Sequence, residues 1–502
     1  MDIKRIPYLL WTFTISFILI TFLPRSLDDT MFMDGMAYAS IARNMAIGKG
    51  SFWQPYFADS FWLPYDNDGF FHGHPPLQFG LESLLFRVLG DSTAVENIYN
   101  LLVLIASVVL IAAIWKKFFT DKDIRAQSWL PVLCWYSMLI VWYAIPNHFL
   151  DSTMAVFCLL SCYFQLKALS EDVKFGTRNL FLVLAGISIF LAVLTKGPVG
   201  LYPLAFSGIY LLFQPRKSFS TFISATAILL ASFAVPLALL LTYDPARVFL
   251  SKYFNGQIVQ ALLQKRERAS NDWTAHFYLL TQLKISILPH VAGIAALYLF
   301  TFLARIKAPL SSDSKNMVLV CLMVACSGIA PMLVSVKQYH HYLIPAVPFL
   351  ALMFAGLAAG RVKVLLQFSH KISTLMIVSA TVICWGVMIN KIRHPAPDIM
   401  TNNIREMMHY VPKNSTLGIC PSLMSNADIH TYFQRYHQLS LSVRIDTARY
   451  ALSDSSCLGE FSKLDTRQIP LEGNYFLIIK NKGQRFSKKQ NGFGMQDTHP
   501  LP

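Results

Sequence analysis

Apolar runs long enough to form membrane-spanning helices dominate the first 390 residues of the chain. Each is about 17–25 residues long, the length at which an apolar helix crosses the hydrocarbon core of a bilayer. The pattern predicts an all-α polytopic membrane protein with about eleven transmembrane helices, and at most thirteen. Spans are expected near residues 8–24, 97–115, 128–145, 149–166, 179–195, 198–213, 220–242, 285–303, 317–335, 342–360 and 372–390.

Three long polar segments interrupt this pattern, near residues 25–96, near 243–284 and from 391 onward. In the first, apolar residues recur at roughly helical spacing within DDTMFMDGMAYASIARNMAIGKG, which predicts an amphipathic helix lying on the membrane surface. A second amphipathic helix is expected in LQFGLESLLFRVLG. After residue 391, β-like runs STLGIC and NYFLIIK flank a helix-like DIHTYFQRYHQ. We therefore expect a transmembrane module over 1–390, with its external loop at 25–96, and a small external α/β domain over 391–502.

Composition supports a membrane protein, and charge indicates its orientation. The chain is 54% apolar and only 14% charged, whereas soluble proteins average about 25% charged residues. Its net charge of +15 comes largely from lysines and arginines in alternate short loops. The positive-inside rule assigns those loops, with the N-terminus, to the cytoplasm. The long polar segments then face outward, and the positive charge implies no nucleic-acid partner. Cys420 and Cys457 lie in the external tail, where they could pair.

Four stretches carry a resemblance to a known family. They are MDGMAYASIARNMAIGKGSFW in the first loop, HPPL, LTKGPVGLYPLA and YHHYLIPAVPFLALMFAG. Their order and spacing against the spans resemble the polytopic C-superfold glycosyltransferases, in the branch of the protein O-mannosyltransferases and the lipid A aminoarabinose transferase. The resemblance covers about residues 1–390. It implies a polyprenyl-phosphate-linked sugar donor, an external active site, and an inverting transfer in which a first-loop aspartate is the base.

Two carboxylates are candidates for catalysis. Asp34 begins the first predicted loop helix, with Tyr38 and Arg43 further along it as additional site candidates. It could act as the general base that deprotonates the acceptor, or it could only cap the helix. Asp151 lies at the outer end of the fourth span, where it could orient an acceptor or an arginine, or simply complement the helix macrodipole.

A departing lipid phosphate gains negative charge, so its site needs cations or hydrogen-bond donors fixed in place beforehand. The candidates fall at predicted external ends of spans: His74, Lys196, Arg268 and Lys337 for the phosphate, with His72, His340 and His341 as further site candidates. Lys196 could instead extend its ammonium group to the membrane surface, and Arg268 could belong to a solvated face. No cofactor is required, although the four histidines could hold a divalent metal.

These observations predict an integral membrane glycosyltransferase in the cytoplasmic (inner) membrane of a bacterium, with its active site on the periplasmic face. The acceptor could be a lipid, a glycan or a protein. A lipid or sugar transporter, or a flippase, would share the spans and the basic loops. Transporters tend to place ionisable groups near the midplane between repeated halves, whereas here the charges gather at one rim and no halves match. A non-catalytic assembly factor that binds lipid is the other alternative.

Overall fold

The computed structural model describes residues 6–28, 30–60, 69–170, 173–213, 219–265, 273–368, 370–395, 398–445, 448–461 and 466–481. The chain divides into two compact units. The helical unit comprises Met1–Leu27 and Asn97–Pro395, and the α/β unit comprises Asp28–Glu96 and Ala396–Pro502. The first loop therefore groups with the C-terminal segment. The sequence-based division at residue 390 had placed that loop with the transmembrane module.

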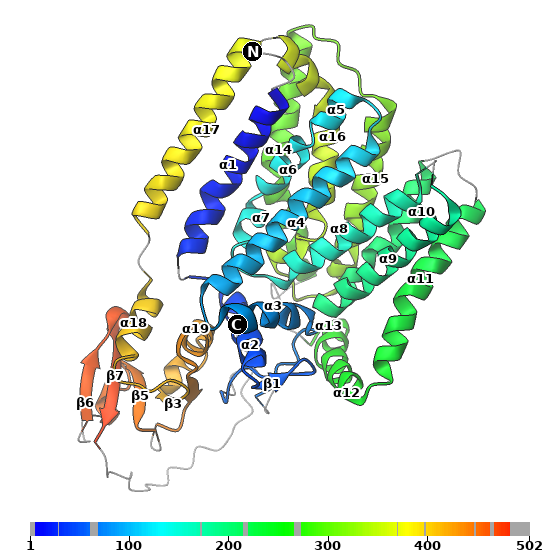
Figure 1. The fold of residues 1–502 in the computed structure, drawn as a ribbon. Coiled ribbons are helices and arrows are strands. Elements are labelled where there is room, and N and C mark those ends of the chain that lie inside the picture. Colours follow the sequence, from blue (N-terminus) through cyan, green and yellow to red (C-terminus); the bar gives the residue numbers. More distant parts are fainter. Residues whose placement is uncertain are drawn as a thin grey trace. The chain divides into compact units, whose positions relative to one another are not determined.

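The helical unit is built from long helices (Figure 1). Some of them are joined by 3-10 or π segments, which we label η. Its elements are α1 (Ile6–Leu27), α4 (Ala94–Phe118), α5 (Lys122–Ala126), α6 (Trp129–Tyr136), α7 (Leu139–Ala144), α8 (Leu150–Ala168), α9 (Phe175–Lys196), η2 (Pro198–Ala205), α10 (Phe206–Leu212), α11 (Phe219–Leu241), α12 (Asp244–Tyr253), η3 (Phe254–Val259), α13 (Gln260–Leu262), η4 (Trp273–Phe277), α14 (Tyr278–Leu303), α15 (Ser312–Ile329), η5 (Ala330–Val334), η6 (His340–Leu343), α16 (Val347–Phe368) and α17 (His370–Arg393).

Eight helices of the described residues are long and apolar enough to cross a membrane. They coincide with eight of the eleven predicted spans, and the full count of eleven stays a prediction. The predicted span near 128–145 is broken into α6 and α7. The span predicted near 198–213 begins as the 3-10 segment η2, within which Pro203 lacks the backbone donor that an α-helix would use at that position. The predicted span near 149–166 is also not among the eight, although it is the continuous 19-residue helix α8; it carries buried polar side chains such as Gln165.

Close helix packing in this unit depends on small residues. A Cβ atom added at Gly186 of α9 would lie 2.5 Å from the Ser232 side chain and 2.8 Å from the Leu229 carbonyl oxygen of α11. Ala185 and Ala225 are fully buried beside this contact. Close backbone approach through small residues is the usual way that membrane helices associate, since burial against lipid gives little hydrophobic gain.

The α/β unit contains a five-stranded sheet with strand order β4-β3-β5-β7-β6. Strands β4, β3 and β5 run parallel, and β7 is antiparallel to both β5 and β6. The unit's elements are α2 (Met33–Ala46), β1 (Gly50–Ser51), β2 (Gln54–Pro55), α3 (Leu77–Leu89), α18 (Ile399–Met407), β3 (Thr416–Ile419), η7 (Pro421–Leu423), α19 (Ala427–His437), β4 (Ser440–Ser442), β5 (Tyr450–Asp454), α20 (Leu458–Phe461), β6 (Thr466–Pro470), η8 (Glu472–Asn474) and β7 (Tyr475–Lys480).

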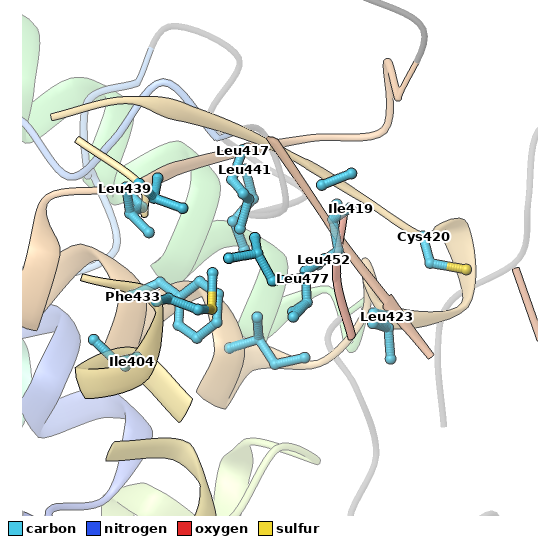
Figure 2. Packing of buried hydrophobic residues seen from close by; sticks show 14 of the residues in the cluster. Ile404, Leu417, Ile419, Cys420, Leu423, Phe433, Leu439, Leu441, Leu452 and Leu477 are labelled. Carbon is cyan, nitrogen blue, oxygen red and sulfur yellow. The ribbon is translucent and has the colours of Figure 1, made fainter. Parts of the chain in front are cut away.

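An apolar cluster packs between the sheet and the helices of this unit. Phe433 of α19 packs against strand residues such as Leu417 and Leu477 (Figure 2). Met31 and Met36 of the first loop belong to the same buried cluster. The α/β unit is therefore assembled from two segments of chain separated by about three hundred residues. The predicted β-like runs coincide with β3 and β7, whereas the position of this unit outside the membrane stays a prediction.

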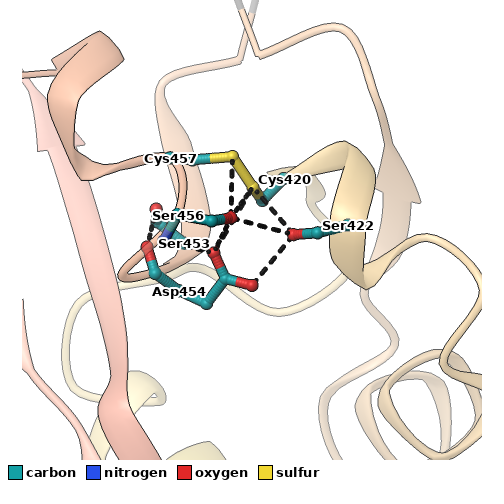
Figure 3. Close-up of a disulfide and its surroundings, with 6 residues drawn as sticks. All are labelled: Cys420, Ser422, Ser453, Asp454, Ser456 and Cys457. Atoms are coloured by element: carbon teal, nitrogen blue, oxygen red, sulfur yellow. Dashed lines mark hydrogen bonds between the residues drawn. A yellow bond between two sulfur atoms is a disulfide. The ribbon is translucent and has the colours of Figure 1, made fainter.

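Cys420 and Cys457, which the sequence indicated could pair, form a disulfide (Figure 3). It connects the end of β3 to the turn after β5, and it is surrounded by hydrogen bonds. Ser422 Oγ donates to Asp454 Oδ2 at 2.9 Å, and the Ser456 backbone N–H donates to Asp454 Oδ1 at 3.0 Å. The disulfide fixes the carboxyl ends of two neighbouring parallel strands.

Candidate functional site

Asp34 lies in the first turn of α2. The N-cap position belongs to Phe32, which makes no side-chain cap, so Asp34 is not the capping residue that a purely structural interpretation required. A carboxylate in the first helical turn still gains from the positive end of the helix macrodipole. The side chain is half-buried, whereas residues 35–45 of the same helix are all buried. The sequence predicted a helix with one apolar face, but α2 is buried around its whole circumference over residues 35–45.

Tyr38 lies one helical turn beyond Asp34, on the same face of α2. Its ring contacts the half-buried His74, with ring centroids 6.1 Å apart, and also Phe71 and Phe79. His74 precedes two prolines, after which α3 begins at Leu77. The predicted site candidates Tyr38 and His74 are thus brought together inside one unit.

Gly73 and His72 complete this corner. A Cβ atom at Gly73 would lie 2.6 Å from the Phe71 ring, so only glycine fits between the two histidines without displacing that ring. His72 is buried, at 8% exposure. The HGHPP stretch therefore forms a rigid corner that holds the His74 imidazole against Tyr38.

Arg43 is fully buried, and its contacts are structural. The guanidinium Nη2 donates to the Gln434 carbonyl oxygen at 2.9 Å, and Nη1 donates to the Arg435 carbonyl oxygen at 3.3 Å. Nη1 also reaches Asp91 at 3.4 Å, and Nε donates to Asn44 Oδ1 at 2.9 Å. Every guanidinium nitrogen is engaged within the α/β unit, so the geometry supports a packing role for this predicted site candidate.

In the helical unit, Asp151 and Lys196 form a buried ion pair. Lys196 Nζ donates to Asp151 Oδ2, and the Asp151 side chain is fully buried. Within the described part of the chain, Asp151 Oδ1 has no hydrogen-bond partner. The lysine ammonium also lies 4.6 Å from the centroid of the Tyr342 ring, a cation–π contact. Asp151 is thus paired with a lysine, and the role expected for it, orienting an acceptor or an arginine, stays a prediction.

The turn after Lys196 explains the sequence TKGP. Gly197 adopts φ +99° and ψ −154°, a conformation that side-chain-bearing residues avoid. The Tyr253 hydroxyl donates to the Lys196 carbonyl oxygen at 3.1 Å. A Cβ atom at Gly197 would come within 2.0 Å of that hydroxyl. The glycine therefore allows α9 to end on Lys196 with its backbone held by Tyr253.

His340 and His341 lie in η6 and belong to the same unit. The ring centroids of His340 and Tyr143 are 5.3 Å apart. The Arg25 guanidinium carbon lies 5.9 Å from the centroid of the same Tyr143 ring. Burial lowers the pKa of His340, and the charge of the nearby Asp151 opposes that shift. His341 stacks on Phe149, with ring centroids 4.4 Å apart.

Lys337 lies at the start of this aromatic stretch. Its ammonium is 5.5 Å from the Tyr339 ring, which stacks in turn on His341. The loop is braced by Gln338, whose side-chain amide donates to the carbonyl oxygens of His276, Met332 and Ser335. Lys337 and the two histidines therefore extend from one fixed loop.

The predicted site residues thus form two groups, one in each unit. Asp34, Tyr38, Arg43, His72 and His74 belong to the α/β unit, and Asp151, Lys196, Lys337, His340 and His341 belong to the helical unit. Arg268 lies outside the described residues. The sequence did not single out Arg25, Tyr143, Tyr253 or Tyr342, although Tyr342 closes the noted YHHY motif.

Metal binding by the four histidines stays a prediction. Over the described ranges, one group of three potential ligands gathers within 4.8 Å, comprising Cys420, Asp454 and Cys457. Two of those three residues form the disulfide. This group therefore offers no intact set of thiolate ligands.

The fold is similar to that of a crystallised membrane protein, ArnT, and the resemblance indicated by the motifs is confirmed. Residues 73–240 match the family described as dolichyl-phosphate-mannose-protein mannosyltransferase. The crystal structure of ArnT from Cupriavidus metallidurans bound to undecaprenyl phosphate is similar with a TM-score of 0.64 and 12% identity, over 95% of this chain and 98% of that one. Its apo state gives a TM-score of 0.60 and 13% identity, over 93% and 96%. No curated protein matches the chain.

Proposed function

We propose that this protein is an integral membrane glycosyltransferase that moves one sugar from a polyprenyl-phosphate-linked donor to a hydroxyl or amine of a lipid, glycan or protein. The observation that carries the proposal is the fold. It is shared over nearly the whole of both chains with a protein that was crystallised with undecaprenyl phosphate. The description of the family that matches residues 73–240 also names a polyprenyl-phosphate sugar as donor. The proposed location is a bacterial inner membrane, with the reaction on its outer face.

In the proposed reaction Asp34 is the general base. Its carboxylate accepts the proton of the acceptor group as that group's oxygen or nitrogen attacks the anomeric carbon of the sugar. The bond from the anomeric carbon to the phosphate oxygen breaks, and the oxygen leaves with the electron pair. Because the acceptor attacks from the face opposite the departing oxygen, the configuration at the anomeric carbon is inverted. A base of this kind contributes roughly 10²–10⁴-fold to the rate. The half-buried position of Asp34 in the first turn of α2 supports this role, since it is neither a cap nor enclosed like its neighbours.

The polyprenyl phosphate that departs becomes more negative as the bond breaks, so fixed positive charge lowers the barrier. Lys196 is the best supported ligand for it. Its backbone carbonyl oxygen is held by the Tyr253 hydroxyl, and its ammonium is held by Asp151 beside Tyr342. Asp151 is then a positioning residue for the lysine. His74, Lys337 and Arg268 remain further proposed contributors.

The test is to incubate the purified protein with a panel of polyprenyl-phosphate sugars and candidate acceptors. Consumption of one donor, with release of the polyprenyl phosphate and appearance of a new glycosidic bond, is the expected result. Parallel proteoliposomes should contain a donor whose sugar is accessible to a probe on one side only. Movement of intact donor across the bilayer without a new bond would instead identify a flippase and overturn the proposal.

A further inference from the structure

The C-terminal helix α19 contacts both ends of α2, the helix that carries Asp34. At the N-terminal end, the Tyr432 hydroxyl donates to the Met31 carbonyl oxygen at 2.8 Å. The same hydroxyl accepts from the Met31 backbone N–H at 3.2 Å. One side chain thus satisfies both backbone groups of a residue that is three positions before Asp34. Met31, at 8% exposure, has little access to water that could replace this partner.

At the other end of α2, Arg43 is directed at the last turn of α19. Its donors reach the carbonyl oxygens of Gln434 and Arg435. Carbonyl groups in the last turn of a helix lack partners within the helix, and a cation there also complements the negative end of the macrodipole. The two contacts, at Met31 and at Arg43, are twelve residues apart and together define how far α2 can slide or rotate against α19.

Arg435 of α19 extends this connection to the rest of the first loop. Its Nε and Nη2 donate to the two Glu96 carboxylate oxygens at 2.6 and 3.1 Å. Its Nη1 donates to Asp91 at 2.8 Å, and Nη2 also reaches the Ser92 carbonyl oxygen at 2.9 Å. The guanidinium lies over the Phe86 ring, 5.1 Å from its centroid.

The charges in this network are buried and are arranged as opposing pairs. Arg43 and Arg435 are at 0% and 2% exposure. Burial would raise the pKa of Asp91, but the charges of Arg43 and Arg435 outweigh it and hold that pKa below its ordinary value. Burial lowers the pKa of Arg43 to about 10, which leaves it charged at neutral pH. Removing one member of such a buried pair leaves the other uncompensated. The network therefore favours one register of α19 against the first loop.

We propose that α19 is a positioning element for the active-site loop, and that Tyr432 is the positioning residue that fixes the Asp34 carboxylate through the Met31 backbone. The proposal rests on the function proposed for Asp34 and deepens it. The C-terminal segment then completes the catalytic loop and is not an accessory domain. Catalytic groups must be held closely, since a misplacement of about 1 Å can lower a rate by about 10²-fold.

The test compares Tyr432→Phe with Tyr410→Phe in the full chain. Both variants delete one hydroxyl from a ring packed against the same apolar cluster. Tyr432→Phe leaves the Met31 backbone groups without their partner, so we expect hydrogen exchange of the amides near the start of α2 to become about 10-fold faster. We also expect kcat to fall about 10-fold or more while the KM values for donor and acceptor stay within about twofold. Tyr410→Phe should change none of these quantities.

Unchanged exchange at the start of α2 in Tyr432→Phe would overturn the proposal, as would equal effects in both variants. The proposed function is tested separately, by measuring turnover of Asp34→Asn. If Asp34→Asn keeps full turnover, Asp34 is not the base, and positioning of its carboxylate has no catalytic meaning. If Asp34→Asn is inactive but Tyr432→Phe has wild-type kcat, the base assignment stands and the positioning proposal is wrong. Tyr432→Phe should lower kcat in the wild-type background but should have no further effect on the residual kcat of Asp34→Asn, since Tyr432 acts through Asp34.

Discussion

The substitution Gly197→Ala is expected to damage both the stability of the helical unit and its affinity for the donor. Gly197 has φ +99° and ends α9 at Lys196, the proposed phosphate ligand. The added methyl group would collide with the Tyr253 hydroxyl, which holds the Lys196 carbonyl oxygen. Tyr253 is itself buried, so its ring has little room to retreat.

The magnitude follows from two contributions. A residue with a side chain in this glycine-only backbone region costs about 1–3 kcal/mol. Loss of the hydrogen bond from Tyr253 to Lys196 removes about 1 kcal/mol more. We therefore expect a total destabilisation of about 2–4 kcal/mol. The direction of the Lys196 side chain should change as well, and donor affinity should fall about ten-fold, because one charge-assisted hydrogen bond contributes about 1.5–3 kcal/mol.

The assay is the melting temperature in detergent together with donor binding, with Gly176→Ala as the matched control. Gly176 lies at the other end of the same helix, and its added Cβ would meet nothing within 4 Å. That control should be neutral or slightly stabilising, since alanine is the better helix former. The double variant with Tyr253→Phe should recover part of the loss, because the colliding oxygen is gone. Equal melting and equal binding in the two alanine variants would refute the reasoning.

Three further predictions concern other parts of the molecule. Burial lowers the pKa of His430 from 6.5 to about 4. As the pH falls from 6.5 to 4, the unfolded chain therefore takes up a proton that the folded chain does not, and the free energy of unfolding should fall by up to about 3 kcal/mol. Between pH 7.5 and 5 the melting temperature should decrease less in His430→Gln than in the wild type, and an equal decrease would contradict this. Cys420 and Cys457 are 37 residues apart. Replacing both by serine should lower the free energy of unfolding by about 4 kcal/mol, because the unfolded chain regains the entropy of the open loop, and should make the α/β unit easier to cleave by proteases. Resistance to proteolysis equal to that of the wild type would argue against this. Lys196→Met should leave the buried Asp151 carboxylate without its positive partner and lower the free energy of unfolding by about 3–5 kcal/mol. Adding Asp151→Asn should restore the melting temperature but not donor affinity. Restored donor affinity in that double variant would show that Lys196 is not the phosphate ligand.

The sequence predicted long helices well because their apolar runs are local features. Breaks within those helices were harder to predict. The start of one predicted span is a 3-10 segment with Pro203 inside it, although the composition of that stretch remains apolar. The pair Asp151–Lys196 could have been anticipated, since α8 and α9 are similar in length and joined by a short turn, which places the start of one beside the end of the other.

The environment of α2 could not be predicted from periodicity. A helix was expected within residues 28–50, and α2 lies there at Met33–Ala46, but an amphipathic surface helix was expected whereas residues 35–45 are all buried. Part of its cover comes from the neighbouring α3, where Phe79 contacts Tyr38, and part comes from α19, about 390 residues further along the chain, through contacts such as Arg43 with Gln434. The same distance explains why Arg43 was taken as a site candidate, since a charge in a loop gives no sign of a buried partner so far away in sequence.

The most direct test of the central claim is turnover of purified Asp34→Asn with a polyprenyl-phosphate sugar that the wild-type protein consumes. The amide is nearly isosteric with the carboxylate but cannot accept the proton, so the variant should fold, bind donor normally and lose roughly 10²–10⁴-fold in transfer rate. Asp59→Asn, an aspartate elsewhere in the same loop, serves as the matched control and should retain activity. Near-wild-type transfer by a correctly folded Asp34→Asn protein would contradict the account.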